Sequence, residues 1–332
     1  MTFLELIISL VIILVGCEGF INGIEWFGKK RGLGEGTVGS LLAAVGTALP
    51  ETMVPIIAIV FVAGEASNEV GVGAILGAPF MLATLAMFVT GVSLVIFRLS
   101  NGRKINPQVN PRIIGRDLTF FLVFYLAAVI AGLLHYRPLS WVMAVFLWIG
   151  YMVYVYVTLR TEGELSGHSR PLYLASSHPP AFPRLRWILL QIAISLGAII
   201  FGAHMFVGAV SEVAIILGVP ALVISLLITP VATELPEKFN SVLWLRARKD
   251  TLAFGNITGA LVFQSAFPVS VGLLLTPWNL NSVSLVSAAM ALGSGFLLLL
   301  WIKLMRTIHW WMLLLSGSFY AFFVFYALSV SI

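Results

Sequence analysis

Long apolar stretches separated by short polar segments run through the whole sequence. A helix needs about 20 apolar residues to cross the hydrocarbon core of a membrane, and ten stretches approach or exceed that length. Hydrophobic residues make up 60% of the chain and charged residues only 10%, which is too few charges to cover a water-facing surface. We therefore predict an all-α polytopic membrane protein and exclude a soluble enzyme and a nucleic-acid-binding protein. The expected helices cover 3–26, 37–63, 70–97, 118–135, 140–159, 187–208, 214–245, 251–276, 282–302 and 308–330.

The basic residues indicate how these helices are oriented. If the N-terminus lies outside, all 19 Lys and Arg residues except Arg137 and Lys238 fall on the cytoplasmic side, where basic residues are enriched in membrane proteins. We expect both termini outside, in a prokaryotic plasma (inner) membrane. The first apolar stretch has no basic residue before it and no small-residue cleavage site, so we expect a transmembrane helix rather than a cleaved signal.

The sequence contains an internal repeat. Residues 16–51 align without a gap to residues 202–237, and both segments close with Leu-Pro-Glu. A second pair of related segments follows, because 73–78 reads GAILGA and 255–260 reads GNITGA. We interpret the chain as the duplication of one unit.

The repeat divides the chain into two halves of five helices each. We expect the first half to cover 1–160, with its motif at about 38–90, and the second to cover 187–332, with its motif at about 220–275. Segment 161–186 contains Pro, Ser and His residues and is expected to be a cytoplasmic linker. An odd number of helices in each half inserts the halves in opposite directions, which predicts two inverted five-helix repeats, as in secondary transporters.

Each repeat motif places a glutamate in the middle of an apolar stretch. An unpaired charge at the depth of Glu51 or Glu237 costs about 2.5 kcal/mol or more, so we expect a bound cation there. Thr47 and Thr233 precede these glutamates by four residues, which places hydroxyl and carboxylate on one helix face. Such oxygen ligands suit Ca²⁺ and Na⁺. The alternative is a structural carboxylate that is protonated or paired with a basic side chain.

Prolines add backbone oxygens to each motif. Pro50 and Pro236 have no N–H to donate to the carbonyl four residues earlier, and these carbonyls belong to Gly46 and Ala232. Each motif therefore offers a carboxylate and a carbonyl oxygen within about one helical turn. We predict a cation site near the membrane midplane, where the two motifs meet.

Three further polar residues are candidates for this site. Glu234 precedes Lys238 by four residues, which favours an ion pair on one helix over direct contact with an ion. Asn256 and Gln264 follow in the second half, and each could bind the cation or form a hydrogen bond between helices.

Small residues recur four positions apart in both halves. Gly73 and Gly77 in the first half correspond to Gly255 and Gly259 in the second. Such spacing lets another helix approach closely, and we expect the motif helices to pack there.

Polar residues also share one face of the first and sixth stretches. These are Glu18, Asn22 and Glu25 in the first, and His204 and Ser211 in the sixth. They could line the ion pathway, or they could be buried against other parts of the protein.

The paired Leu-Pro-Glu motifs, each followed by a glycine-rich segment, resemble the alpha repeats of the sodium/calcium exchanger family within the calcium/cation antiporters. The resemblance implies ten helices, a central cytoplasmic loop and both termini outside. It also implies that Glu51 and Glu237 are the central ion ligands, that Thr47 and Thr233 add oxygens, and that the first and sixth helices form a mobile gating pair.

This chain departs from the family pattern at several positions where the family places serine or another oxygen ligand. The residues found there are Ala48, Ala78, Leu82, Glu234, Ala260 and Gln264. Fewer cation sites are therefore expected than in the family.

The resemblance implies exchange of Ca²⁺, or a similar divalent cation, for Na⁺ by alternating access. The alternatives are H⁺-coupled divalent cation exchange and a transport-inactive ion-binding membrane protein. A channel could use the same carboxylates, but inverted repeats favour alternating access. We expect no cofactor, with inorganic cations and the lipid bilayer as partners; the oligomeric state stays open.

Catalysis is not expected, because the sequence lacks the motifs of intramembrane proteases. Such chemistry needs a buried serine with a histidine, two membrane-buried aspartates or a His-Glu-x-x-His motif. The only two aspartates, Asp117 and Asp250, are expected at cytoplasmic helix ends. The single cysteine, Cys17, excludes a disulfide within the chain.

Overall fold

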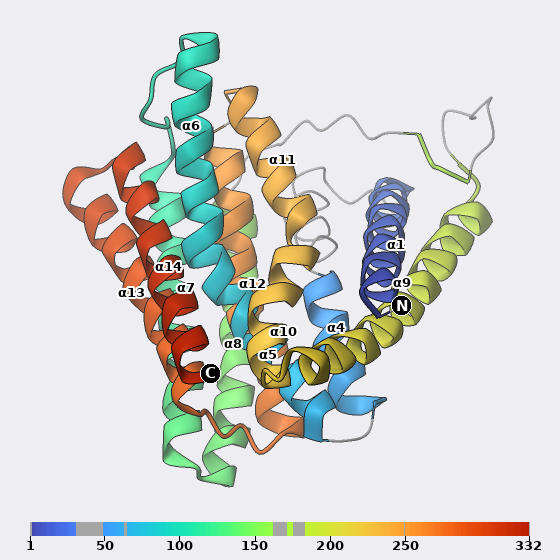
Figure 1. Cartoon of the computed structure of the whole chain (residues 1–332). Helices are drawn as coiled ribbons and strands as arrows, with labels where there is room; N and C mark the ends of the chain where they lie inside the picture. The colour runs from blue at the N-terminus through green and yellow to red at the C-terminus, as the bar shows by residue number, and fades with distance from the viewer. Residues whose placement is uncertain are drawn as a thin grey trace.

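The computed structural model describes residues 2–30, 49–62, 65–161, 171–174, 183–248 and 250–331. Every element in these ranges is a helix (Figure 1), and eight of the described helical spans are long and apolar enough to cross a membrane. The elements are α1 (Thr2–Lys30), α4 (Leu49–Val60), α5 (Glu65–Met81), the π-helix η2 (Leu82–Ala86), α6 (Met87–Asn101), α7 (Pro111–Leu134), α8 (Arg137–Thr161), α9 (Leu185–Leu217), α10 (Ala221–Thr233), α11 (Leu235–Arg246), α12 (Asp250–Leu275), α13 (Ser282–Met305) and α14 (Trp310–Ser331).

The helices follow the predicted order, but some predicted bounds were wrong. The range expected to be one helix over 214–245 begins with the last turn of α9, which ends because Gly218 adopts a φ of +63°. The rest of this range forms α10 and α11, which are separated at Glu234. Helix α7 begins at Pro111 rather than at 118, because the Asn110 side chain accepts the Arg112 N–H and caps the helix. Of the expected helix 37–63, the structure describes α4 from Leu49.

The same packing pattern occurs in both halves of the chain. The continuous span α5–η2–α6 packs against α13 and α14, and α12 packs against α7 and α8. Helix α4 packs against α5 as α11 packs against α12, and α7 packs against α13 across the two halves. This doubled pattern is expected of two inverted repeats. The predicted linker bounds stay a prediction, because 162–170 and 175–182 lie outside the described residues.

Helices α1 and α9 lie side by side along much of their length (Figure 1). Glycines permit this close crossing: a Cβ on Gly16 would lie 3.1 Å from the Ser195 carbonyl oxygen, and one on Gly202 would lie 3.0 Å from the Ser9 carbonyl oxygen. The pair joins the other helices mainly through contacts of α9 with α4, α5 and α10.

Arg137 ties the start of α8 to the end of α12. Its guanidinium donates to the Leu273 carbonyl oxygen at 3.2 Å and also to the carbonyl oxygens of Leu274 and Thr276. The last carbonyls of a helix lack partners within the helix, and a basic side chain satisfies them well. Arg137 thus has a structural reason to lie at the end of the bundle where basic residues are otherwise not expected.

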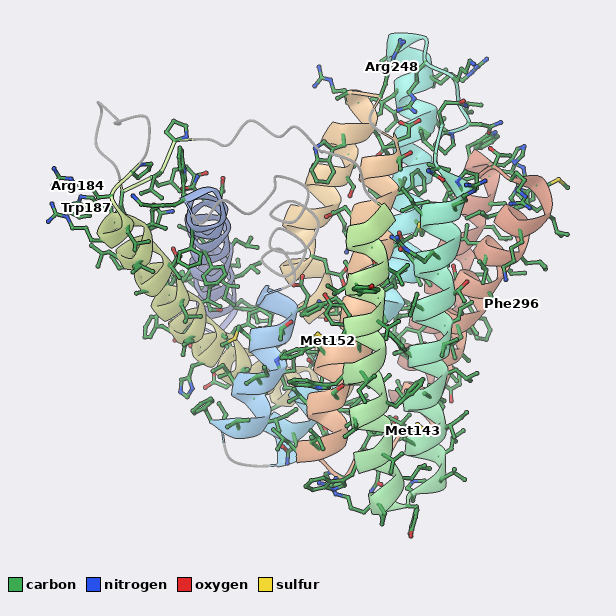
Figure 2. All side chains as sticks on the ribbon, turned by 180° about the vertical axis from the view of Figure 1, so that it is seen from behind. Met143, Met152, Arg184, Trp187, Arg248 and Phe296 are labelled. Carbon is green, nitrogen blue, oxygen red and sulfur yellow. The ribbon has the colours of Figure 1, made fainter. Side chains whose placement is uncertain are left out.

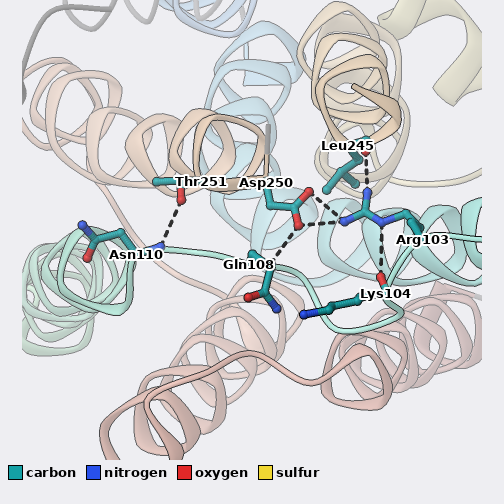
Figure 3. Close-up of polar contacts among 7 residues, drawn as sticks. All are labelled: Arg103, Lys104, Gln108, Asn110, Leu245, Asp250 and Thr251. Atoms are coloured by element: carbon teal, nitrogen blue, oxygen red, sulfur yellow. Dashed lines mark hydrogen bonds and ion pairs between the residues drawn. The ribbon is translucent and has the colours of Figure 1, made fainter. Parts of the chain in front are cut away.

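A buried ion pair joins the two halves at the opposite end (Figure 3). Arg103, which follows α6, makes a bidentate contact with Asp250 at the start of α12, with distances of 2.8 and 2.7 Å. The guanidinium also donates to the carbonyl oxygens of Leu245 and Lys104. Asp250 accepts the Gln108 N–H at 2.7 Å. Arg103 and Asp250 are 6% and 4% exposed, so both charges are satisfied almost entirely by the protein.

Candidate cation-binding site

Glu51 is buried in the interior of the helical bundle. It lies in the first turn of α4 and is only 2% exposed. Helix α4 packs against α5, α9 and α12, which come from both halves of the chain. The next residue, Thr52, is also buried. Thr52 was not among the ligands predicted from the sequence, although its position beside the motif glutamate was the available signal.

The second copy of the motif interrupts its helix. Glu234 separates α10 from α11, with φ −84° and ψ 0°. Its N–H donates to the Pro230 carbonyl oxygen at 3.0 Å, and its carbonyl oxygen accepts from the Lys238 N–H at 3.1 Å. The interruption comes two residues before Pro236, which cannot donate to the Ala232 carbonyl oxygen. Because Glu234 keeps both of its backbone hydrogen bonds, the oxygen that this break can offer to an ion is the Ala232 carbonyl, to which Pro236 donates nothing.

Several predicted ligands lie outside the described part of the structure. Gly46 and Thr47 lie outside the described residues, and the side chains of Ala232, Thr233 and Glu237 are outside the described side chains. Glu237 belongs to the first turn of α11, as Glu51 belongs to the first turn of α4. The meeting of these two glutamates around one ion therefore stays a prediction.

Glu234 and Lys238 form the ion pair that their spacing predicts. The Lys238 Nζ atom lies 3.0 Å from Glu234 Oε2. Glu234 is fully buried and Lys238 is 8% exposed. The interpretation of Glu234 as a paired side chain is thus confirmed, whereas its direct contact with an ion is untested.

Asn256 and Gln264 have different surroundings on α12. The Asn256 Nδ2 atom donates to the Ser241 hydroxyl of α11 at 3.2 Å, which ties these two helices together. Gln264 is 1% exposed, and its amide atoms make no hydrogen bond with the described residues. Eight residues of helix separate the two side chains by about 12 Å along the axis and roughly 80° around it. Buried amides normally have partners, so Gln264 has the greater capacity to bind a ligand.

The close approach expected at the small residues is confirmed in the first half. A Cβ on Gly73 would lie 2.6 Å from the Leu222 carbonyl oxygen, and one on Gly77 would lie 2.5 Å from that of Leu226. Helix α10 therefore crosses α5 in near backbone contact, and the Ser225 hydroxyl donates to the Val70 carbonyl oxygen at 2.6 Å.

At the corresponding glycines of the second half, no described atom comes so near. A Cβ on Gly255 would meet nothing within 4 Å, and one on Gly259 would lie 3.6 Å from the Tyr154 hydroxyl. The repeat-related partner of this surface belongs to 31–48, outside the described residues. Close packing there stays a prediction.

Asp117 has a role that its sequence position did not suggest. It is 1% exposed rather than solvated at a helix end. Its carboxylate accepts the Thr258 hydroxyl at 2.8 Å and pairs with Arg116 at 3.0 Å. This contact fixes α12, the helix of Asn256 and Gln264, against α7. Thr258 lies within the glycine-rich motif segment, and this position was the sequence signal for its contact with Asp117.

The polar face of α1 is buried against protein at Asn22. Asn22 Oδ1 accepts from Gln191 of α9 at 2.9 Å, and its Nδ2 donates to the Pro171 carbonyl oxygen at 3.2 Å. Glu18 accepts the Tyr173 hydroxyl at 2.9 Å. These contacts favour a structural role for this face, in which segment 171–174 joins α1 and α9. The Glu25 side chain is outside the described side chains.

On α9, the two corresponding polar residues do not converge on a site. His204 is exposed, and the Ser211 hydroxyl donates to the Val207 carbonyl oxygen of its own helix at 3.0 Å. A role of these two residues in an ion pathway stays a prediction.

Comparison with known proteins assigns most of the chain to one family. The family model described as sodium/calcium exchanger protein matches residues 1–160 and 187–329. The sodium/calcium exchanger MaX1 of Methanosarcina acetivorans is 23% identical, with 97% of each chain covered. The inner membrane protein YrbG of Escherichia coli is 22% identical, covering 84% of this chain and 81% of its own length.

Solved structures share the fold. The H⁺/Ca²⁺ exchanger CAX matches with a TM-score of 0.75 and 15% identity, over 97% of this chain and 80% of its own. The sodium-calcium exchanger NCX_Mj matches with a TM-score of 0.58 and 20% identity, over 97% of each chain. Together with the doubled packing pattern, these likenesses confirm the predicted fold of about ten helices in two inverted repeats. The chain therefore belongs to the sodium/calcium exchanger family of membrane cation antiporters.

Proposed function

We propose that the protein exchanges Ca²⁺, or a similar divalent cation, for Na⁺ by alternating access between its two repeats. The observation that supports this most is the burial of Glu51 at 2% exposure, in a repeat motif whose second copy breaks its helix at Glu234. A buried carboxylate is costly unless a cation or a proton compensates it. A divalent cation bound by carboxylate and backbone oxygens meets this requirement.

The proposed ligands come from both copies of the motif. Glu51 and Glu237 supply the charge, and the other oxygens come from Thr47, Thr233 and the carbonyls of Gly46 and Ala232. Gln264 is the further side chain best suited to reach the ion, because its buried amide makes no hydrogen bond with the described residues. Asn256 is a weaker candidate, since Ser241 already accepts from its amide.

The charge of the proposed site matches a divalent ion. Lys238 compensates the charge of Glu234 at 3.0 Å, so the remaining carboxylates of Glu51 and Glu237 carry two negative charges. This balance favours an ion with two positive charges, because an uncompensated charge in a low-dielectric site is unfavourable.

H⁺-coupled exchange is the second candidate function. Ala78, Leu82 and Ala260, which stand where the family places oxygen-bearing side chains, are at most 2% exposed and belong to or adjoin the apolar core. These positions therefore provide no side-chain oxygen for additional Na⁺ ions. Protons can instead compete for clustered carboxylates, because repulsion between like charges favours protonation of one of them.

The proposed orientation has both termini outside, in a prokaryotic plasma membrane. The two basic residues that depart from the cytoplasmic pattern each have a structural partner. Arg137 binds the terminal carbonyls of α12, and Lys238 pairs with Glu234. The remaining basic residues support a cytoplasmic location for the loops that contain them.

Ion flux into proteoliposomes tests both candidate functions. Ca²⁺ uptake is measured under an imposed Na⁺ gradient with pH clamped, and under an imposed pH gradient with Na⁺ clamped. We expect uptake that follows the Na⁺ gradient and is lost in Glu51→Gln. Uptake that follows only the pH gradient would replace Na⁺ by H⁺ as the counter-ion. Uptake under neither gradient would contradict both functions and favour a transport-inactive ion-binding protein.

A further inference from the structure

A basic groove lies where the beginning of α7 meets the end of α13. It is open to the surroundings and has a volume of about 400 Å³. Its lining includes four basic residues and no acidic residue, and the structure describes the whole of this lining. The four basic residues are Arg112, Arg116, Lys303 and Arg306.

Three of the four basic side chains are available to an anion. Arg116 already pairs with the buried Asp117 at 3.0 Å. Among the described residues, no carboxylate forms an ion pair with Arg112, Lys303 or Arg306, and all three are exposed. The first turn of α7 does not supply the anion site, because the Asn110 side chain accepts the Arg112 N–H at 3.0 Å. The basic side chains must therefore provide the attraction.

Aromatic residues place this groove at the depth of lipid headgroups. Trp301 lies two residues before Lys303 on α13, and its indole N–H donates to His309 Nδ1 at 2.9 Å. The Trp301 and Trp311 rings lie 4.9 Å apart. Tryptophans concentrate at the boundary between membrane and water, so the adjacent basic residues lie where headgroup phosphates are found.

The groove also has the apolar surface that a lipid needs. Gly115, Phe120 and Ile302 contribute to its lining. Beside it on α13, Leu304 and Met305 are 67% and 52% exposed, as expected for residues that face acyl chains. Figure 2 shows Phe296 further along α13, toward the middle of the bundle, whereas Arg248, which follows α11, lies at the end of the bundle. A soluble anion would use only the basic residues of such a groove.

We propose that this groove binds the phosphate headgroup of an anionic phospholipid. Arg112, Lys303 and Arg306 hold the phosphate, while the acyl chains lie along the apolar surface of α7 and α13. Basic pockets between transmembrane helices on the cytoplasmic side have this preference, and the proposed orientation puts the groove in the cytoplasmic leaflet. Because α7 and α13 belong to different halves of the chain, the bound lipid joins the two repeats.

Thermal unfolding of the purified full chain tests the proposal. The protein in neutral detergent is titrated with phosphatidylglycerol, with phosphatidylcholine and with inorganic phosphate, and lipid retained after washing is identified by native mass spectrometry. We expect phosphatidylglycerol alone to raise the Tm and to be retained. The triple variant Arg112→Gln, Lys303→Gln, Arg306→Gln should bind it roughly 100-fold more weakly. Arg116 is left intact because it also pairs with Asp117.

A charge-matched variant separates the groove from general attraction to a basic surface. Arg98, Lys104 and Arg246 are exposed and lie outside the groove, so Arg98→Gln, Lys104→Gln, Arg246→Gln should keep the response to phosphatidylglycerol. If the triple variant does not fold, the single variant Lys303→Gln is measured in its place, and it should show an intermediate loss of phosphatidylglycerol binding. An unchanged response in the folded triple variant, an equal loss in the matched variant, or a full response to inorganic phosphate would each overturn the proposal.

Discussion

The ammonium nitrogen of Lys238 lies 3.0 Å from a carboxylate oxygen of Glu234, and both side chains are buried where α10 gives way to α11. The resemblance to the exchanger family places a serine where this chain has Glu234. The pair thus adds a carboxylate beside the proposed ion site, together with the ammonium group of Lys238 as its permanent partner. Under the proposed function, Lys238 compensates Glu234 and leaves the charge of the ion site to Glu51 and Glu237.

Removal of Lys238 alone should be more harmful than removal of the pair. Lys238→Met leaves the Glu234 carboxylate buried without its basic partner, which costs about 3–5 kcal/mol. The double variant Glu234→Gln, Lys238→Met should recover most of this loss. The double-mutant cycle compares the wild type, Lys238→Met, Glu234→Gln and the double variant by thermal unfolding. Strictly additive changes in stability would show that the pair is not energetically coupled.

Neutralising Glu51 should strongly weaken binding of the divalent cation. Glu51→Gln keeps the size of the buried side chain but removes half of the proposed charge, so Ca²⁺ affinity should fall by roughly 100-fold or more. Calorimetric titration with Ca²⁺ and flux in proteoliposomes measure the effect. Glu5→Gln, at an exposed position of α1, is the control. A Glu51→Gln protein that exchanged Ca²⁺ at the wild-type rate would remove Glu51 from the site.

Gly77→Ala should destabilise the contact between α5 and α10. The added Cβ would lie 2.5 Å from the Leu226 carbonyl oxygen, so the helices must move apart at a cost of about 1–3 kcal/mol. Gly197→Ala is the matched control, since it is also within a helix but its Cβ meets no described atom within 4 Å. There the gain in helix propensity, about 0.5–1 kcal/mol, should leave the protein equally or more stable. Equal Tm values for the two variants would contradict the close crossing.

Arg103→Met should destabilise the protein by about 3–5 kcal/mol, because it leaves Asp250 buried without its basic partner. Arg103→Lys should recover only part of this loss, since an ammonium group cannot reproduce the bidentate contact. Arg98→Met removes an exposed charge and should change stability by less than about 0.5 kcal/mol. Thermal unfolding compares the three variants, and a Tm of Arg103→Met equal to that of Arg98→Met would refute the role of this ion pair.

Features that depend on neighbouring residues could be predicted from the sequence. Among the described residues, the order of the helices follows from the succession of apolar stretches, and the Glu234–Lys238 pair follows from its spacing of four residues. The close approach at Gly73 and Gly77 follows from their small size. Helix ends were less accurate, because the end of α9 depends on the left-handed conformation of Gly218 rather than on hydrophobicity.

Contacts between distant parts of the chain could not be predicted in this way. Arg103 and Asp250 are 147 residues apart, and no local pattern links them. Asp117 looks like an ordinary polar residue at a helix end, and its burial depends on how Thr258 approaches from α12. The repeat predicts that Glu51 and Glu237 share a site. The burial of these side chains and their contacts depend on the packing of the helices, which the sequence pattern does not contain.

The ion pair between Arg103 and Asp250 also constrains the biosynthesis of the protein. Ribosomes add about 5–20 residues per second, so roughly 7–30 s separate the synthesis of Arg103 from that of its partner. During this interval the first half is inserted while the guanidinium still depends on water or lipid headgroups. The bundle can close at this end only after the second half has followed, so the two repeats complete their assembly together rather than as independently finished units.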